Sequence, residues 1–263
     1  MKLAMSNIAW TPDERLQAYR AMADAGFAGI EIAPGLFFHA SDDPFVPDNA
    51  AASEALAEIA DHGLEFVSMQ SLLFGVQGAG LFDGEDARAA LVKGMNRAID
   101  LAGRFGIPNL VFGSPAQRRV PEIMPMAQAL SEAGEVFRAL GDSAKAAGTC
   151  ITIEANPAAY GTNFLNTLEE ARAFVAEVNH PAIAAILDLG AMHMNGSFDE
   201  VPGQIEALMP KLNHVHVSEP ELAPAPAEPE GLAAVISALA KHGYTKAVSI
   251  EMRRPESGLE GVR

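Results

Sequence analysis

Four short apolar runs in the second half of the chain carry an ionisable side chain at or near their ends. These side chains are Glu154, Asp188, His216 and Glu251. A lone charge at the end of a buried strand is costly, and three carboxylates packed together repel one another unless a cation lies among them. Mixed oxygen and nitrogen donors suit Mn, Mg, Zn or Co. The pattern therefore predicts one divalent metal ion, against the alternative of four separate salt bridges with Arg and Lys.

These side chains can share a site only if the runs are neighbouring strands, and the chain has that organisation. Short β-rich runs alternate with longer helical ones. The expected strands are residues 2–7, 28–33, 64–70, 108–113, 149–154, 183–188, 213–218 and 246–251. Alternating units imply parallel strands joined by crossover helices. Eight such units in 263 residues predict an α/β fold, a single closed (β/α)8 TIM barrel, in which the carboxyl ends of the strands face one site.

The expected helices carry end signals. Residues 86–104 place apolar side chains at a helical period. Thr167 with Glu170 forms the sequence of a capping box, and Pro181 is expected to end that helix. Several helical runs are followed by a glycine, which accepts the left-handed conformation that closes a helix. These glycines are Gly26, Gly63, Gly106, Gly148 and Gly243.

No composition shift marks a domain boundary, so residues 1–263 are expected to form one domain. The Pro- and Ala-rich stretch 220–230 is predicted to form a long loop after the seventh strand. This loop would lie on the face where barrel loops carry function. After the eighth strand only residues 253–263 remain, which is short for a closing helix. Either the last helix is a truncated stub or the chain has been cut there.

The charge balance bears on partners. Hydrophobic residues make up 49% of the chain and charged residues 20%, and 34 acidic against 18 basic residues give a net charge of −16. Such a surface repels phosphate backbones, so nucleic acid is not expected as a partner. The acidity can also serve solubility alone. A small-molecule substrate remains the expected partner, and it can be anionic if a local basic pocket exists.

Cysteine use and hydropathy bear on location. The one cysteine, Cys150, lies in an apolar run and is interpreted as a small buried hydrophobe. No intrachain disulfide can form, which fits a reducing cytoplasm. The first residues lack the apolar stretch of a signal peptide. No stretch of about 18 apolar residues suggests a membrane span.

The histidines of the seventh strand have different expected roles. His214 and His216 lie two residues apart and so point to the same face of the strand. His216 is nearer the carboxyl end and is the candidate metal ligand. His214 lies one layer deeper and is expected to be a hydrogen-bonded core residue.

The whole chain resembles the xylose isomerase-like barrel superfamily of sugar phosphate isomerases and epimerases. The segments that carry the resemblance are Ser6-Asn7-Ile8-Ala9-Trp10, Ile30-Glu31-Ile32-Ala33-Pro34, Ser68-Met69-Gln70-Ser71, Val111-Phe112-Gly113-Ser114-Pro115, Ile153-Glu154-Ala155-Asn156-Pro157, His216-Val217-Ser218-Glu219-Pro220 and Ser249-Ile250-Glu251-Met252. In the ketose 3-epimerases of this superfamily a Glu, Asp, His, Glu set binds the metal. The matching residues here are Glu154, Asp188, His216 and Glu251.

The resemblance implies a metal-dependent sugar or sugar phosphate isomerase or epimerase. The metal would chelate a carbonyl and a neighbouring hydroxyl of the substrate and acidify the adjacent C–H bond. Glu154 and Glu251 would act as the acid/base pair, one removing a proton and the other returning it. Return to the opposite face gives epimerisation, and return to the neighbouring carbon gives isomerisation. The resemblance also leaves room for a homo-oligomer.

Two positions depart from the epimerase pattern. Where those enzymes place a His three residues after the Asp ligand, this chain has Ala191, and the next histidine is His193. Where they place an Arg shortly after the His ligand, this chain reads Glu219-Pro220-Glu221-Leu222. A different substrate contact is therefore expected, with His193 a candidate to supply it through a shifted loop.

Other candidate substrate contacts are Glu31, Gln70, Trp10 and Arg253. Glu31 ends the second strand and could bind substrate hydroxyls or pair with a nearby Lys or Arg. Gln70 ends the third strand, and Trp10 could wall a sugar pocket or only pack its loop. Arg253 could read a phosphate or carboxylate. Arg118, in the loop after the fourth strand, is expected to be exposed, which is also the simpler view of Arg253.

Three other functions compete with the isomerase. A metal-dependent lyase or dehydratase acting on a keto-polyol or a dehydroshikimate-like acid would use the same metal and lose a β-hydroxyl. A phosphodiester nuclease would need more histidines than the seven present, and a basic face. A non-catalytic sugar-binding barrel would be favoured by the loss of one of the four ligands, and none is lost.

Overall fold

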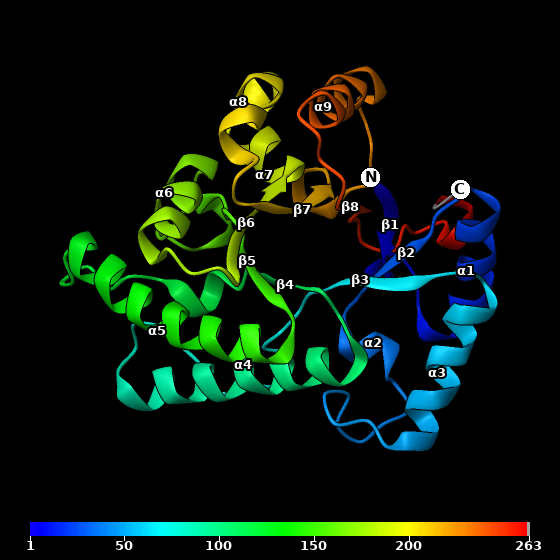
Figure 1. Ribbon diagram of the computed structural model, residues 1–263, viewed down its shortest axis with the longest axis horizontal. Coiled ribbons are helices and arrows are strands. Elements are labelled where there is room, and N and C mark those ends of the chain that lie inside the picture. Colours follow the sequence, from blue (N-terminus) through cyan, green and yellow to red (C-terminus); the bar gives the residue numbers. More distant parts are fainter. Residues whose placement is uncertain (262–263) are drawn as a thin grey trace. The chain divides into compact units, whose positions relative to one another are not determined.

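The computed structural model describes residues 1–261 and arranges them around eight strands that form a closed barrel (Figure 1). The strands follow one another in chain order, and the last pairs in parallel with the first. They are β1 Lys2–Ser6, β2 Gly29–Ile32, β3 Glu65–Met69, β4 Asn109–Phe112, β5 Cys150–Ile153, β6 Ile183–Asp188, β7 Leu212–Val217 and β8 Ala247–Ile250. The predicted (β/α)8 TIM barrel is confirmed, and each expected strand matches to within one residue at either end.

The helices lie between the strands, as the alternating pattern predicts. They are α1 Arg15–Asp24, α2 Pro34–Phe37, α3 Asn49–Asp61, α4 Glu85–Phe105, α5 Met126–Ala147, α6 Leu168–Val178, α7 Leu189–Met194, α8 Val201–Leu208 and α9 Pro229–Lys241. From the end of β8 to residue 261 the structure has a short 3-10 turn, Gly258–Gly261, in place of a full helix. Among the described residues, no helix is both long enough and apolar enough to cross a membrane.

Glycines end several helices and a capping box begins one, largely as predicted. Gly106 and Gly148 follow α4 and α5 with φ of 66° and 76°, a conformation that glycine adopts without steric cost. The Thr167 capping box begins α6. This helix ends before Pro181, as predicted, and Asn179 caps it two residues earlier in the left-handed conformation with φ of 47°. Asn is one of the few residues besides glycine that visit this region routinely.

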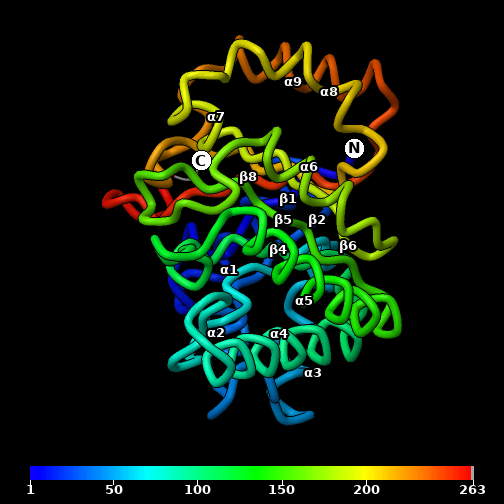
Figure 2. Tube along the Cα trace, turned by 90° about the vertical axis from the view of Figure 1, so that its left-hand side faces the viewer, coloured from blue at the N-terminus to red at the C-terminus, as the bar shows by residue number. Residues whose placement is uncertain are grey.

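The chain divides into two compact units. Unit 1 comprises Met1–Met69, Asp188–Pro210 and the chain from His214 onward, and unit 2 comprises Gln70–Leu187 and Lys211–Asn213. In unit 1, α8 packs against α9. In unit 2, the long helices α4 and α5 run side by side, as Figure 1 and Figure 2 both show. That residues 1–263 form a single domain stays a prediction.

The core of unit 2 is a row of phenylalanines. Phe112, Phe137, Phe174, Phe164 and Phe82 contact one another in that order, edge to face, with ring centroids 5.0 to 5.8 Å apart. They connect β4 with α5, α6 and the loop before α4. Aromatic pairs in this geometry add to the stabilisation from apolar burial. The row therefore anchors helices of unit 2 on their strands.

The inward face of the unit 1 strands is closed at its amino end by small side chains. Ala4, Val67 and Ala247 form a buried cluster there. Gly29 is needed beside them, because a Cβ at this position would lie 2.6 Å from a methyl of Val67 and 2.9 Å from Ala4. Further along the strands the inward face becomes polar, with Ser6, Glu31, His214, His216 and Ser249 all fully buried. The apolar layer thus supports a layer of polar and ionisable groups.

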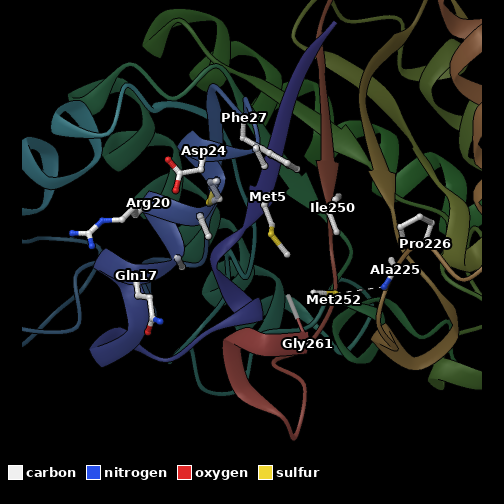
Figure 3. A pocket seen from close by; sticks show the side chains of 14 residues that line it. Met5, Gln17, Arg20, Asp24, Phe27, Ala225, Pro226, Ile250, Met252 and Gly261 are labelled. Carbon is white, nitrogen blue, oxygen red and sulfur yellow. Dashed lines mark hydrogen bonds between the residues drawn. The ribbon is translucent and has the colours of Figure 1, made fainter. Parts of the chain in front are cut away.

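The outward face of the same strands borders a cavity of about 750 Å³. Figure 3 shows Met5 of β1, together with Ile250 and Met252 from β8 and the residues after it, facing α1 and the loop at Ala225. Successive side chains of a strand point to opposite faces. Ile250 therefore lies on the other side of the sheet from its neighbours Ser249 and Glu251. Apolar side chains make up most of the lining of this cavity, with Gln17, Arg20 and Asp24 on its α1 side, and the cavity lies on the other face of the sheet from the polar layer.

Candidate metal centre

Three predicted ligands meet in unit 1 at the carboxyl ends of β6, β7 and β8. The imidazole Nδ1 of His216 lies 3.2 Å from Glu251 Oε2 and 3.5 Å from Asp188 Oδ2. One ligand atom from each of the three residues lies within 4.8 Å of the others. The His216 side chain is completely buried, while those of Asp188 and Glu251 keep 12% and 10% of their surface exposed. The two carboxylates therefore face an imidazole in a largely dry environment.

Local structure fixes the orientation of the Asp188 carboxylate. Asp188 is the last residue of β6 and also caps α7, because its Oδ1 accepts a hydrogen bond of 2.6 Å from the backbone N–H of Ala191. Its Oδ2 accepts a hydrogen bond of 3.0 Å from the Ser218 hydroxyl, which in turn accepts from the backbone N–H of Gly190 at 2.8 Å. A Cβ at Gly190 would come within 2.9 Å of this hydroxyl. Glycine thus lets α7 start close against the end of β7.

Glu31 lies beneath these ligands with its carboxylate between two imidazoles. Its Oε1 lies 3.0 Å from Nε2 of His216, and its Oε2 lies 2.9 Å from Nε2 of His214. The glutamate is 0% exposed and the His214 side chain 1%. Burial alone would raise the pKa of Glu31. The charges and hydrogen bonds of His216 and His214 outweigh burial and hold this pKa below its usual value.

This arrangement revises one expectation and supports another. Glu31 was expected to contact substrate hydroxyls or a Lys or Arg, whereas its oxygens face the two histidines. His214 was expected to be a hydrogen-bonded core residue, and its burial against Glu31 agrees. The sequence carried a clue to the pair of histidines, since His214 and His216 share one face of β7. Nothing in it pointed to Glu31 as their partner, because Glu31 is 185 residues from His216.

The chemistry of the donor set fits a cation. An ionised carboxylate can only accept hydrogen bonds, so with Glu31 ionised the Nε2 of His216 is the protonated nitrogen. Without a metal ion, a second proton on Nδ1 gives His216 the charge that lowers the pKa of Glu31. A metal ion would replace that proton and bind the Nδ1 lone pair, and Nδ1 faces the Asp188 and Glu251 carboxylates. Three electron-rich groups converging in this way are stabilised by a positive ion. The buried cluster of His, Glu and Asp side chains is consistent with a divalent metal site.

The fourth predicted ligand, Glu154, is the first residue after β5 in unit 2 and is half-buried. Its Oε2 accepts a hydrogen bond of 2.8 Å from the Asn156 side chain. Gly113 leaves room for it, because a Cβ there would lie 2.4 Å from the same Oε2. Two residues from neighbouring strand ends therefore shape the position of this carboxylate.

Arg118 is a feature of unit 2 that sequence reasoning missed. It was expected to be exposed, but it is 0% exposed and donates a hydrogen bond of 2.8 Å from Nη2 to the Glu154 backbone carbonyl. Burial lowers the pKa of the guanidinium to about 10, and the nearby Glu154 charge opposes that shift. The guanidinium thus holds the backbone at the end of β5. A 3-10 turn, Pro115–Arg118, carries the side chain inward, and the sequence gave no signal of it.

Asn7 is a second residue that the sequence did not single out. Its side-chain oxygen accepts from the backbone N–H of Ala33 at 2.7 Å, and its amide donates to the Ala33 carbonyl at 3.3 Å. This pair of bonds joins the ends of β1 and β2 in unit 1. The role of Asn7 is structural, and a single Asn in the sequence gives no signal of that role.

The remaining predicted substrate contacts lie in different surroundings, and their roles stay predictions. In unit 1, Trp10 is 3% exposed and packs edge to face on Tyr19 with centroids 6.2 Å apart. His193 in α7 stacks on Phe198 at 3.8 Å. The side chain of Arg253 is 62% exposed and donates to the Glu221 carbonyl, in line with the simpler view of it. Gln70 in unit 2 is buried, with 8% exposure.

A comparison with known protein families identifies the family of this chain. The model of the xylose isomerase-like TIM barrel family matches residues 19–263. The chain belongs to this family. Its membership confirms the resemblance inferred from the strand-end motifs. The family accounts for the barrel fold.

Several of the similar proteins are named as epimerases. A ketose 3-epimerase from Arthrobacter globiformis is 27% identical over 230 residues, which cover 83% of this chain and 72% of that protein. Among solved structures, 3-keto-D-glucoside 4-epimerase from E. coli matches with a TM-score of 0.77 and 19% identity, covering 99% of this chain and 95% of that one. D-psicose 3-epimerase from Clostridium cellulolyticum H10, solved with D-tagatose, matches with a TM-score of 0.76 and 18% identity, covering 100% and 88%. The two structures show a shared fold.

Proposed function

We propose that this protein is a divalent-metal-dependent isomerase or epimerase of a sugar or sugar derivative. The observation that carries the proposal is the buried His216, whose imidazole lies between Glu31 on one edge and the carboxylates of Asp188 and Glu251 on the other. The ketose 3-epimerase from Arthrobacter globiformis supports the choice of reaction class. Asp188, His216 and Glu251 would hold the ion.

We assign Glu154 as the fourth ligand. It follows β5, as Glu251 follows β8, and β5 to β8 are consecutive strands of the barrel. Residues at equivalent strand ends of a barrel converge on one site. The mixed carboxylate and imidazole set suits Mn, Mg, Zn or Co. When bound, the ion would polarise a substrate carbonyl and so acidify the neighbouring C–H bond.

Glu154 and Glu251 would then move the proton. One carboxylate accepts the proton from the carbon beside the carbonyl, and the electron pair of the broken C–H bond forms a carbon–carbon double bond as the carbonyl oxygen takes up negative charge. The other carboxyl group returns a proton, and the carbonyl re-forms. Return to the opposite face of the same carbon gives the epimer. Return to the former carbonyl carbon, with transfer of the hydroxyl proton, gives the isomer.

The substrate is expected to be a small sugar-derived molecule with a carbonyl next to a hydroxyl-bearing carbon. Ala191 and the segment around Leu222 replace a His and an Arg of the ketose 3-epimerase pattern, so the contacts to the rest of the substrate should differ. Nucleic acid and membrane surfaces are not expected partners of a chain with a net charge of −16. A homo-oligomer and a cytoplasmic location remain expectations.

Proton exchange tests this function. The metal-loaded protein should transfer deuterium from D2O into the carbon beside the carbonyl of one member of a panel of keto sugars, as followed by mass spectrometry and NMR. Glu154→Gln and Glu251→Gln should each lower the exchange rate by about 100-fold or more, since general acid–base catalysis contributes roughly this amount. Glu206→Gln, on the exposed side of α8, is the matched control and should keep the full rate.

Two results would contradict the proposal. If the metal-loaded protein exchanges no proton with any keto sugar or keto acid tested, the isomerase assignment fails. If exchange is accompanied by release of water and a new ultraviolet absorbance, the reaction is the elimination of a lyase or dehydratase on the same site.

A further inference from the structure

We infer that Glu31 is a positioning residue that presents Nδ1 of His216 to the metal ion. This inference rests on the proposed metal site and extends it to a side chain that lies below the ligands. Glu31 is fully buried, and its carboxylate lies within 3.2 Å of the His216 Nε2 through both oxygens. The opposite ring nitrogen of His216 faces Asp188 and Glu251.

The two edges of an imidazole are coupled. In the neutral ring one nitrogen carries the proton and the other a lone pair. A carboxylate at Nε2 keeps the proton on that nitrogen and leaves the lone pair on Nδ1, which is the form a metal ligand requires. The contact also restrains rotation of the ring, because it holds Nε2 in place. Such outer partners of ligating histidines commonly raise metal affinity by about 10- to 100-fold.

His214 helps to stabilise the Glu31 carboxylate in its buried position. An isolated carboxylate in a dry interior is very costly. The Nε2 of His214 lies 2.9 Å from Oε2 of Glu31, and the two imidazoles lie nearly perpendicular, with centroids 5.2 Å apart. His214 therefore places a second imidazole nitrogen at ion-pair distance from Glu31, two residues earlier on the same face of β7. The pair of histidines clamps the carboxylate in one orientation.

An alternative interpretation is that Glu31, His214 and His216 form a separate metal site. One ligand atom from each of Glu31, His214 and His216 lies within 4.8 Å of the others. The positioning role is favoured, because both oxygens of Glu31 lie at hydrogen-bond distances of 3.0 and 3.2 Å from Nε2 of His216. The two readings differ in how many ions the protein binds.

Glu31→Gln is the sharpest variant, because it preserves shape and changes only the pattern of donors and acceptors. Its amide has one accepting oxygen and one NH2 group. An NH2 group that faces Nε2 of His216 would draw the proton to Nδ1, where the lone pair is needed. Glu31→Asp keeps the negative charge on a shorter side chain and should retain the native tautomer. Ser249→Ala, a buried position opposite His216 in the β7–β8 register, is the matched control.

The experiment measures the affinity of each chelator-treated protein for Mn²⁺ alone, by competition with a fluorescent chelator, and the visible spectrum of its Co²⁺ form. Thermal unfolding of the metal-free proteins shows that each variant is folded. We expect Glu31→Gln to bind Mn²⁺ about 10- to 100-fold more weakly, as for other outer-shell substitutions. Its Co²⁺ spectrum should change. Glu31→Asp should lose less affinity and keep the wild-type spectrum, and Ser249→Ala should match wild type.

Each contrary outcome is distinct. Wild-type affinity and an unchanged Co²⁺ spectrum in Glu31→Gln would overturn the inference and leave the proposed function intact. Two equivalents of Mn²⁺ in wild type, with one lost in this variant, would overturn it in favour of a second metal site. Failure of wild type to bind any ion would remove the proposed function itself. If Glu31→Gln does not fold, His214→Asn decides, since it should weaken Mn²⁺ binding relative to Ser249→Ala.

Discussion

The two faces of the strands in unit 1 differ, because the outward face borders a cavity and the inward face carries the ionisable groups. The outward face of β1 and β8 borders a cavity of about 750 Å³ lined by apolar side chains such as Met5 and Ile250. On the inward face of β7 and at the end of β8, His216 and Glu251 converge with their nitrogen and oxygen 3.2 Å apart. The cavity has room, but its titratable lining side chains, Arg20 and Asp24, both come from the single helix α1. The convergence of ionisable groups, rather than the hollow, therefore identifies the candidate site.

The largest expected effect comes from truncating the inward cluster. His216→Ala removes the donor from Glu31 and leaves a buried carboxylate with fewer partners, and breaking such a buried pair destabilises a protein by about 3–5 kcal/mol. Urea unfolding of the chelator-treated variant and wild type measures the difference. A loss below about 1 kcal/mol, the size of a surface pair, would show that the cluster carries little charge in the folded protein.

Adding and removing the metal should give the next largest change. An ion that binds only the folded state stabilises it by about 2.7 kcal/mol at a concentration 100 times its dissociation constant. The unfolding temperature of wild type should therefore rise on addition of Mn²⁺ and fall again with a chelator. Glu251→Gln should show a smaller rise. An equal rise in both proteins would place the binding ion away from Glu251.

The outward cavity should respond differently to truncation. Met252 is 2% exposed and lines the cavity, and its sulfur accepts a hydrogen bond from the backbone N–H of Ala225 at 3.5 Å (Figure 3). Met252→Ala should cost about 2 kcal/mol, the lower end for such truncations, because one side of the residue already faces a cavity. Its affinity for Mn²⁺ should match wild type. A large loss of Mn²⁺ affinity would contradict the claim that only the inward face contributes to metal binding.

The smallest effect is expected at a partly exposed carboxylate of unit 1, that of Glu14. The Arg254 guanidinium and the Thr11 backbone N–H donate hydrogen bonds to Glu14 and lower its pKa from 4.5 to about 2. A lowered pKa stabilises the folded protein above the ordinary value, and this contribution is lost as the pH falls from about 4.5 towards 2. The difference in urea midpoint between wild type and Glu14→Gln should shrink across that interval. A difference that is constant with pH would contradict the assignment.

The sequence was sufficient for the barrel and for which side chains end its strands. Apolar runs at regular intervals and glycines after helices such as Gly106 and Gly148 carry this information locally. The alternation of inward and outward residues then indicates that His214 and His216 share a face. These features depend on neighbours within a few residues, so they can be read without a structure.

What the sequence could not give depends on contacts between distant segments. The partners of Glu31, the choice of Nδ1 as the His216 nitrogen that faces the carboxylates, and the burial of Arg118 all arise from tertiary packing. The cavity beside Met252 depends on how the outer helices cover the strands, and no local pattern encodes that.

The most direct test of the account is the metal content of the purified protein. Inductively coupled plasma mass spectrometry would be applied to wild type and to Glu251→Gln, each as isolated and after incubation with Mn, Zn, Co and Mg. The account predicts about one equivalent of one of these ions in wild type, as one barrel site provides, and less in the variant. If both proteins remain metal-free under every condition, Glu154, Asp188, His216 and Glu251 are a salt-bridged core instead of a metal site.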